Sequence, residues 1–204
     1  MGSPCGPTLA NIFLCYCERK WLRDCPDQYK PFLYRRYVDD TFLLFKEPDH
    51  VNDFLTYLNS KHVNIKFTKE SERDNSLPFL DVLVTRKHSQ FETSVFRKKT
   101  FTGLSSHFLS SEPKIYKINT IKTLLYRCYH ICSSYFKFHE EENFLKNFFS
   151  TNGFPVNLYY SQVKQFLSRI YSQNLISQTA NKKKIYASFP YYGYVSERLR
   201  TEIK

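Results

Sequence analysis

The order of apolar and polar positions divides the chain into a mixed first part and a helical second part. After "GSPCGPT", apolar residues recur at helical spacing, which predicts a helix over about 8–23 that begins with Thr8 as its cap. The expected buried face of this helix consists of Leu9, Ile12, Phe13 and Tyr16. A second helix is expected around 51–58, with Asp49 as its cap. Both helices belong to the mixed part.

Strand patterns occupy the rest of this part. In "YRRYVDDTFLLF", residues 34–45, apolar and β-branched residues flank Asp39-Asp40, which predicts two short strands that meet at a tight turn. Alternation over 63–71 predicts a half-buried strand. Residues 77–87 and 91–101 predict another strand pair, joined around His88-Ser89.

After Gly103 the pattern becomes helical. Amphipathic helices are expected within 113–136, 140–153 and 157–174, and "GFP" separates the last two. The domain prediction is a strand-and-helix part over 1–103, a helical part over 104–172, and a linker with the start of another segment over 173–204. Antiparallel strands followed by helices indicate an α+β fold.

Composition points to a nucleic-acid partner. The 204 residues carry a net charge of +11, and 18% of them are aromatic. A basic, aromatic-rich chain suits phosphates and stackable bases, although the same numbers fit a basic protein without such a partner. No apolar run is long enough for a membrane span, no secretory signal is visible, and the six cysteines form no CxxC pair. We therefore expect an intracellular location, nuclear or cytoplasmic, with no membrane partner.

The adjacent carboxylates of Asp39 and Asp40 are the main chemical feature. Their mutual repulsion is relieved when divalent cations with oxygen ligands bind between them, and such ions can activate an attacking oxygen and stabilise a leaving one. The alternative is an ordinary hairpin turn, in which Asp is common.

The surrounding sequence segments favour the metal-binding interpretation over an ordinary turn. "GSPCGPTLANIFL", "YRRYVDDTFLLF", "NIKFTKE" and "LPFLDVLV", in this order, resemble motifs B, C, D and E of the reverse transcriptase palm. More narrowly, these phrases with "SVFRKKTFTG", "NGFP" and "FPYYGYVSERLR" are similar to the Penelope-like retroelement group. The resemblance covers almost the whole chain. It implies a partial right-hand palm followed by a helical thumb.

The resemblance also implies roles for individual residues. Asp39 is expected as a ligand of Mg²⁺ or Mn²⁺ and Asp40 as a support of the same site, so both count as catalytic. Residues expected to contact the nucleotide, the template or the primer end are Gly2, Ser3, Pro4, Tyr37 and Val38. Most relatives have Leu at the position of Cys5, a departure that concerns packing more than chemistry.

Further roles follow from motifs D and E. Lys66 is the expected catalytic lysine that protonates the leaving pyrophosphate, with Lys61 and Lys69 as competing candidates. Phe79 and Leu80 are expected to form the primer grip. Asp81 could be a third metal ligand, but a hydrogen-bonded structural carboxylate is favoured.

Basic residues are expected along the nucleic acid. Arg97, Lys98 and Lys99 are predicted to bind phosphates, with a solvated basic turn as the alternative. Four cations of the helical part could grip a template–primer duplex or be ordinary exposed charges: Lys114, Lys117, Lys122 and Arg127.

The family's motif A, which supplies a further metal-binding aspartate, is not present in this chain, and neither are the fingers. We therefore expect a fragment of an RNA-directed DNA polymerase that is inactive alone and whose intact form uses an RNA template, a DNA primer and dNTPs. The alternatives are a non-catalytic nucleic-acid-binding module and, more remotely, a protein-interaction domain with an unrelated hairpin.

Overall fold

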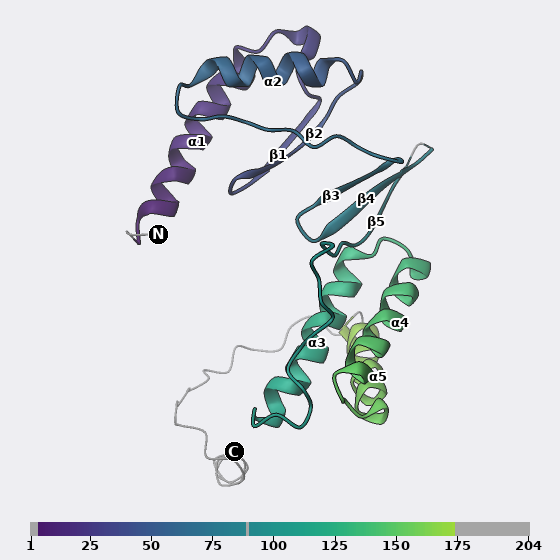
Figure 1. The fold of residues 1–204 in the computed structure, drawn as a ribbon. Coiled ribbons are helices and arrows are strands. Elements are labelled where there is room, and N and C mark those ends of the chain that lie inside the picture. The colour runs from purple at the N-terminus through teal and green to yellow at the C-terminus, as the bar shows by residue number, and fades with distance from the viewer. Residues whose placement is uncertain (1–3, 89, 174–204) are drawn as a thin grey trace. The chain divides into compact units, whose positions relative to one another are not determined.

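The computed structural model describes residues 4–88 and 90–173, which form a mixed α+β structure (Figure 1). The chain divides into two compact units, residues 1–80 and 81–204. Gly2 and Ser3 lie outside the described residues, as does the segment expected to follow Gln173. None of the described helices has both the length and the apolar character needed to cross a bilayer.

The first unit packs two helices against a hairpin. Its elements are α1 (Gly6–Arg23), the short 3-10 helix η1 (Asp27–Tyr29), β1 (Leu33–Tyr37), β2 (Asp40–Leu44), α2 (His50–Lys61) and β3 (Ser76–Phe79). The buried side chains are Cys17, Trp21, Cys25, Phe54 and Leu58. These side chains join α1 to α2 and leave the partly buried Tyr34 and Leu43 to cover the core from the hairpin side.

The predicted face of α1 is wrong. Leu9, Ile12, Phe13 and Tyr16 are all exposed, and the buried residues of α1 are Cys17, Glu18 and Trp21. Thr8 is not the cap either, because the helix already begins at Gly6. Helical spacing identifies an apolar stripe, but only the neighbouring elements decide whether the stripe is covered.

The predicted hairpin is confirmed. β1 and β2 pair antiparallel, from Leu33 opposite Leu44 to Tyr37 opposite Asp40. The connecting loop is therefore Val38-Asp39, and Asp40 is already the first residue of β2.

The strand predicted over 63–71 is wrong, although its alternation is real. Ile65 and Phe67 pack against the core, but the segment forms no ladder with another strand. The side chain of Asn59 takes the place of a strand partner: it accepts from the Phe67 N–H at 2.7 Å and donates to the Phe67 carbonyl at 3.1 Å. The alternation of apolar and polar residues in this segment therefore reflects partial burial of an extended chain and not membership of a sheet.

Up to Gln173, the described part of the second unit combines a hairpin with three helices. Its elements are β4 (Val82–Lys87), β5 (Gln90–Val95), α3 (Lys114–Ile131), α4 (Tyr135–Thr151) and α5 (Val156–Gln173). β4 and β5 pair antiparallel, with Lys87 opposite Gln90, which confirms the second predicted strand pair and its turn at His88. The strand expected over 77–87 is divided into β3 and β4. Leu80, at a φ of +54°, lies where the chain turns between them.

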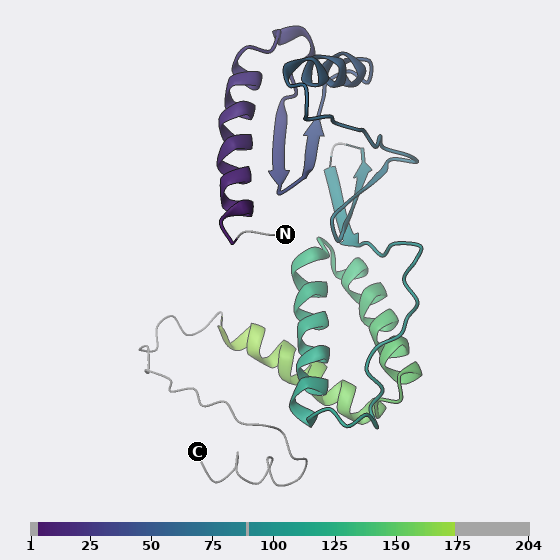
Figure 2. The same ribbon diagram turned by 60° about the vertical axis from the view of Figure 1, so that its left-hand side comes forward.

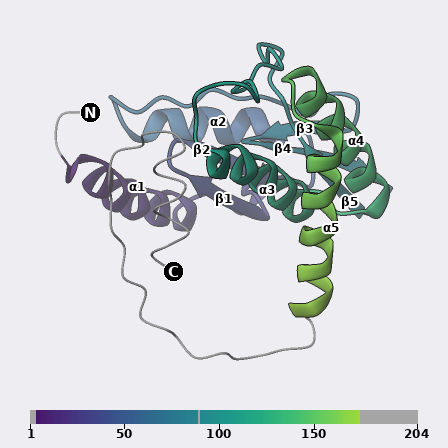
Figure 3. The same ribbon diagram turned by 90° about the horizontal axis from the view of Figure 1, so that it is seen from below.

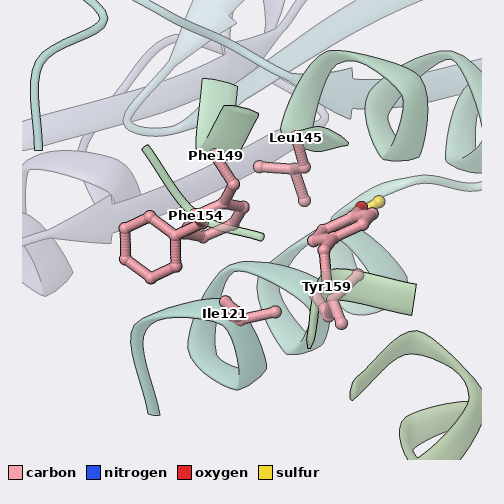
Figure 4. Packing of buried hydrophobic residues seen from close by; sticks show 7 residues of the cluster. Ile121, Leu145, Phe149, Phe154 and Tyr159 are labelled. Carbon is pink, nitrogen blue, oxygen red and sulfur yellow. The ribbon is translucent and has the colours of Figure 1, made fainter. Parts of the chain in front are cut away.

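The three helices share one apolar core, shown in Figure 4. Its buried members are Ile121, Leu125, Cys128, Leu145, Phe149, Phe154 and Tyr159. This core confirms that the first two helices are amphipathic, although Phe144 of α4 is exposed, and α3 ends and α4 begins earlier than expected. Ser134 caps α4 by accepting a hydrogen bond from the Lys137 N–H at 3.3 Å. The last turns of α5 continue past α3 and α4 (Figure 3).

Direct contacts attach β5 to the helices. The Thr93 hydroxyl donates to the Ile131 carbonyl at 2.6 Å, and the Ser133 N–H donates to the Thr93 carbonyl at 3.1 Å. These bonds explain why the compact units divide after Leu80, whereas the sequence places the change of composition near Gly103.

Candidate functional site

The tip of the β1–β2 hairpin presents the two predicted metal ligands to solvent. Asp39 lies in the turn and Asp40 closes it opposite Tyr37, and both carboxylates are exposed. Over residues 4–88 and 90–173, no hydrogen bond or ion pair engages either carboxylate. Within the first unit the tip lies at the end of the hairpin away from α2 (Figure 2). Both carboxylates are therefore available to an external ligand.

The backbone of this turn has an unusual conformation. Val38 has a φ of +55°, in the left-handed region that β-branched residues rarely adopt. The side chains of Tyr37 and Val38 are mostly exposed, at 61% and 65%. Two predicted primer-end residues thus flank the carboxylates at the surface, while Pro4 is exposed in the turn before α1.

A polar cluster between α1 and β1 supports the turn. The Arg36 guanidinium donates from Nη1 to the Val38 carbonyl at 2.8 Å, and its Nε lies 2.7 Å from Glu18 Oε1. The same carboxylate oxygen accepts from the Tyr34 hydroxyl at 2.6 Å. Burial and the bond to Glu18 raise the pKa of Tyr34, and the bond to Glu18 raises the pKa of Arg36.

Sequence reasoning missed Glu18 and the inward role of Arg36. Glu18 is 8% exposed, so it lies on the buried side of α1. The available signal was a glutamate beside Cys17 and three residues before Trp21, but this signal is visible only once the buried face of α1 has been identified correctly.

The donor chemistry at the tip suits a magnesium or manganese ion. Both metals prefer oxygen ligands, and Mg²⁺ is commonly held by one or two carboxylates together with water and substrate phosphate. Asp39 and Asp40 fit that requirement in type. In the described ranges, no cluster of three or more His, Cys, Asp or Glu side chains is placed to hold a metal.

The three candidate acid lysines, Lys61, Lys66 and Lys69, contact residues of α2. Lys66 Nζ donates to the Asn59 carbonyl at 3.0 Å, and Lys69 Nζ donates to the Asn52 side chain. Lys61 Nζ lies 4.0 Å from the centre of the Tyr57 ring. The described contacts of all three are with α2, so an acid role for Lys66 stays a prediction.

The predicted primer-grip residues lie at the end of the first unit. The Phe79 ring packs against Phe42 of β2, with ring centres 5.4 Å apart, and Leu80 is partly exposed. At the start of the second unit, Asp81 forms an ion pair with Arg127, at 3.3 Å from Oδ1 to Nη2. This pair favours the structural interpretation of Asp81, although its side chain is 70% exposed and not buried as expected.

The three predicted phosphate-binding residues have different environments. Arg97 forms a two-pronged ion pair with Glu141 and lies 3.7 Å from the centre of the Phe144 ring. Lys98 and Lys99 are exposed. Phosphate binding therefore stays a prediction for the lysines, while the Arg97 guanidinium is occupied by α4.

Lys117 cannot be one of the exposed gripping cations. It is 7% exposed, and its Nζ donates to the carbonyls of Phe108 and Ser110 at 2.6 and 2.7 Å. It anchors the segment before α3. Lys114 is exposed, Lys122 is half-buried, and Arg127 is engaged with Asp81.

Comparison with known families gives one match. The animal helix-turn-helix domain matches residues 105–164, which include α3, α4 and the first half of α5. No curated protein and no solved structure matches the chain.

Proposed function

We propose that this chain is part of an RNA-directed DNA polymerase of the reverse transcriptase type, with the β1–β2 hairpin as its metal-binding element. The observation that carries the proposal is the exposed turn at Asp39-Asp40, in which two adjacent carboxylates have no protein partner in the described residues. Adjacent carboxylates repel each other, and a divalent cation bound between them would relieve this repulsion.

The chain's own residues have distinct tasks in this proposal. Asp39 and Asp40 hold the divalent cation, which supplies positive charge for the phosphate oxygens when it is bound. Tyr37 and Val38 provide an exposed surface on which the end of a primer can rest. Complete catalysis needs a further carboxylate, so we expect little polymerization by this chain alone.

A nucleic-acid partner is supported separately by the second unit. Its helices match a helix-turn-helix family, a motif that commonly places a helix against DNA. The exposed Lys98 and Lys99 and the overall charge of +11 provide sequence-independent attraction to phosphates. A non-catalytic nucleic-acid-binding module is therefore the second candidate.

Manganese titration of the isotope-labelled chain, followed by NMR, tests the proposal. Mn²⁺ should broaden the amide signals of Val38, Asp39 and Asp40 first, and Asp39→Asn should remove this selectivity. Asp49→Asn is the matched control, because Asp49 is an exposed acid of the same unit at the start of α2. Broadening that is no stronger at the hairpin than at Asp49 would overturn the metal-site proposal.

Binding to an RNA–DNA duplex separates the two candidates. We expect affinity that falls as salt rises and that is the same for the wild type and Asp39→Asn without metal. Salt-dependent binding without hairpin-selective Mn²⁺ broadening would favour the non-catalytic module. Loss of both signals would favour a protein-interaction domain.

A further inference from the structure

Arg36 connects α1 to the backbone of the hairpin turn. One guanidinium contacts three groups: the Glu18 carboxylate at 2.7 Å, the Cys15 sulfur at 3.1 Å and the Val38 carbonyl at 2.8 Å. Two of these contacts fix the guanidinium on α1, and the third holds the turn. A planar group with several fixed N–H directions suits this task better than a single ammonium.

The turn needs such support because its sequence does not favour its conformation. Two-residue hairpin loops with a positive φ at the first position usually have Gly, Asn or Asp there. This loop has Val38 at +55°, although a β-branched side chain is among the least tolerant of that region. The local preference of the chain opposes the observed turn, so a tertiary contact has to offset the difference.

The cost of burying Glu18 also calls for an explanation. Its side chain and that of Arg36 are about 9% and 10% exposed, and buried ion pairs often stabilise a fold no more than apolar residues of the same size. The Glu18 Oε1 atom is contacted by both Tyr34 and Arg36. A pair that adds little to stability but fixes one orientation is suited to positioning.

We propose that Arg36, held by Glu18, is a positioning residue that imposes the Val38-Asp39 turn and thereby sets the direction of the Asp39 carboxylate toward a divalent cation. The part of this inference that concerns the cation rests on the proposed function. The part that concerns the turn does not, and the two can be tested separately.

The first experiment compares two neighbouring arginines in the full chain. Arg36→Met removes the clamp, whereas Arg35→Met removes an equal charge from the adjacent, exposed position, whose guanidinium donates to the Tyr34 carbonyl at 3.1 Å. The Cα and Cβ chemical shifts of Val38 report its backbone conformation, and amide exchange of Tyr37 and Asp40 reports closure of the turn. We expect Arg36→Met to lose the left-handed shifts and to speed exchange by about tenfold, in keeping with a charged hydrogen bond. Arg35→Met should change exchange by less than about twofold.

Relief of the backbone strain provides a second test. Glycine adopts a positive φ readily, so Val38→Gly should remove the need for the clamp. We expect Arg36→Met to accelerate exchange much less in the Val38→Gly background than alone. An equal acceleration in both backgrounds, or an equal effect of Arg35→Met and Arg36→Met, would overturn the proposed clamp.

Folding and metal binding have their own controls. If Arg36→Met unfolds because Glu18 is left unpaired, the combined Glu18→Gln and Arg36→Met variant removes both charges and should still lose the left-handed Val38 shifts. Both variants lose one positive charge, so the comparison is matched for charge. Because only Arg36→Met removes the clamp, Mn²⁺ broadening at Asp39 should need several times more Mn²⁺ in Arg36→Met than in Arg35→Met. If Arg36→Met changes the Val38 chemical shifts but Mn²⁺ does not broaden the wild-type hairpin signals, the metal proposal fails and the clamp stands. If Mn²⁺ binds equally well to Arg35→Met and Arg36→Met, the positioning role of Arg36 fails.

Discussion

The guanidinium of Arg97 and the carboxylate of Glu141 meet in a two-pronged ion pair, with Arg97 Nη1 2.8 Å from Glu141 Oε2. These residues are far apart in the sequence, and their pairing joins the segment after β5 to α4. Phe144, one turn further along α4, covers the guanidinium, with 3.7 Å between Arg97 Cζ and the ring centre. A residue expected to face phosphates is thus part of the second unit's internal structure.

Removing this pair should destabilise the second unit. Arg97→Met leaves the Glu141 carboxylate, about 10% exposed, without its partner, so we expect a loss of about 2 kcal/mol, less than for a fully buried pair. Amide exchange of Ile121 and Leu125 measures it, since both residues lie in the core of that unit. Lys98→Met, at the exposed neighbouring position, should change stability by less than about 0.5 kcal/mol. Equal effects of the two variants would contradict this assignment.

The exposed lysines beside Arg97 should contribute to nucleic-acid binding. Lys98→Met with Lys99→Met should weaken binding to an RNA–DNA duplex and lower the salt slope by about 2, because each phosphate contact contributes about one unit. Lys114→Met and Lys117→Met provide an exposed and a buried cation for reference. Only Lys114→Met can change the slope directly, and an unchanged slope in the Lys98 and Lys99 double variant would exclude these lysines from the contact surface.

Lys117 should matter for stability instead. Its Nζ donates to the Phe108 and Ser110 carbonyls at 2.6 and 2.7 Å, and Lys117→Met leaves both acceptors without this donor. We expect a loss of about 2 kcal/mol by amide exchange of the helical core, whereas Lys114→Met should be nearly neutral. A neutral Lys117→Met would show that water replaces the donor without cost.

The buried side chain of Asn152 also connects several backbone groups of this unit. Asn152 is 4% exposed; its side chain accepts from the Ser105 N–H at 2.8 Å and donates to the Gly103 and Phe148 carbonyls at 3.0 and 2.8 Å. Asn152→Ala should cost about 2–3 kcal/mol, since several buried groups lose their partners. Thermal unfolding measures this loss, and Asn143→Ala at an exposed position of α4 is the control. Equal melting temperatures of the two variants would contradict the assignment.

The pH dependence of the second unit should include a contribution from Glu92. Lys87, whose Nζ lies 2.6 Å from Oε2, and then the Ser134 hydroxyl, which donates to Oε1 at 2.9 Å, lower the pKa of Glu92. Because the folded pKa lies below the unfolded one, the stabilisation is complete above the ordinary glutamate value of about 4.3 and is lost as the pH falls through the folded pKa. Melting temperatures measured from about pH 5 to pH 3 should fall less steeply in Glu92→Gln than in the wild type. Glu140→Gln, which removes an exposed acid paired with Lys137, is the control.

Local patterns predicted local structure well. The hairpin over 34–45, the strand pair around His88 and the amphipathic character of α3 and α4 are set by residues close in sequence, and each is confirmed. The strand prediction for 63–71 was wrong because partial burial of Ile65 and Phe67 produces the same alternation as a strand. The Asn59 side chain bonds the Phe67 backbone in place of a strand partner. Lys117 is buried against the Phe108 and Ser110 carbonyls, and Arg97 is paired with Glu141 of α4, which the local sequence did not predict.

The sequence alone determined where two carboxylates sit at a hairpin turn, because alternation and turn chemistry act over a few neighbouring residues. It also determined the excess of positive charge and the helical character of the second unit. Only the tertiary structure decided which cations are free and which are buried, which face of α1 is covered, and what holds Val38 in its unfavourable conformation. These outcomes depend on contacts between residues distant in the chain, such as Glu18 with Arg36, and no local pattern contains them.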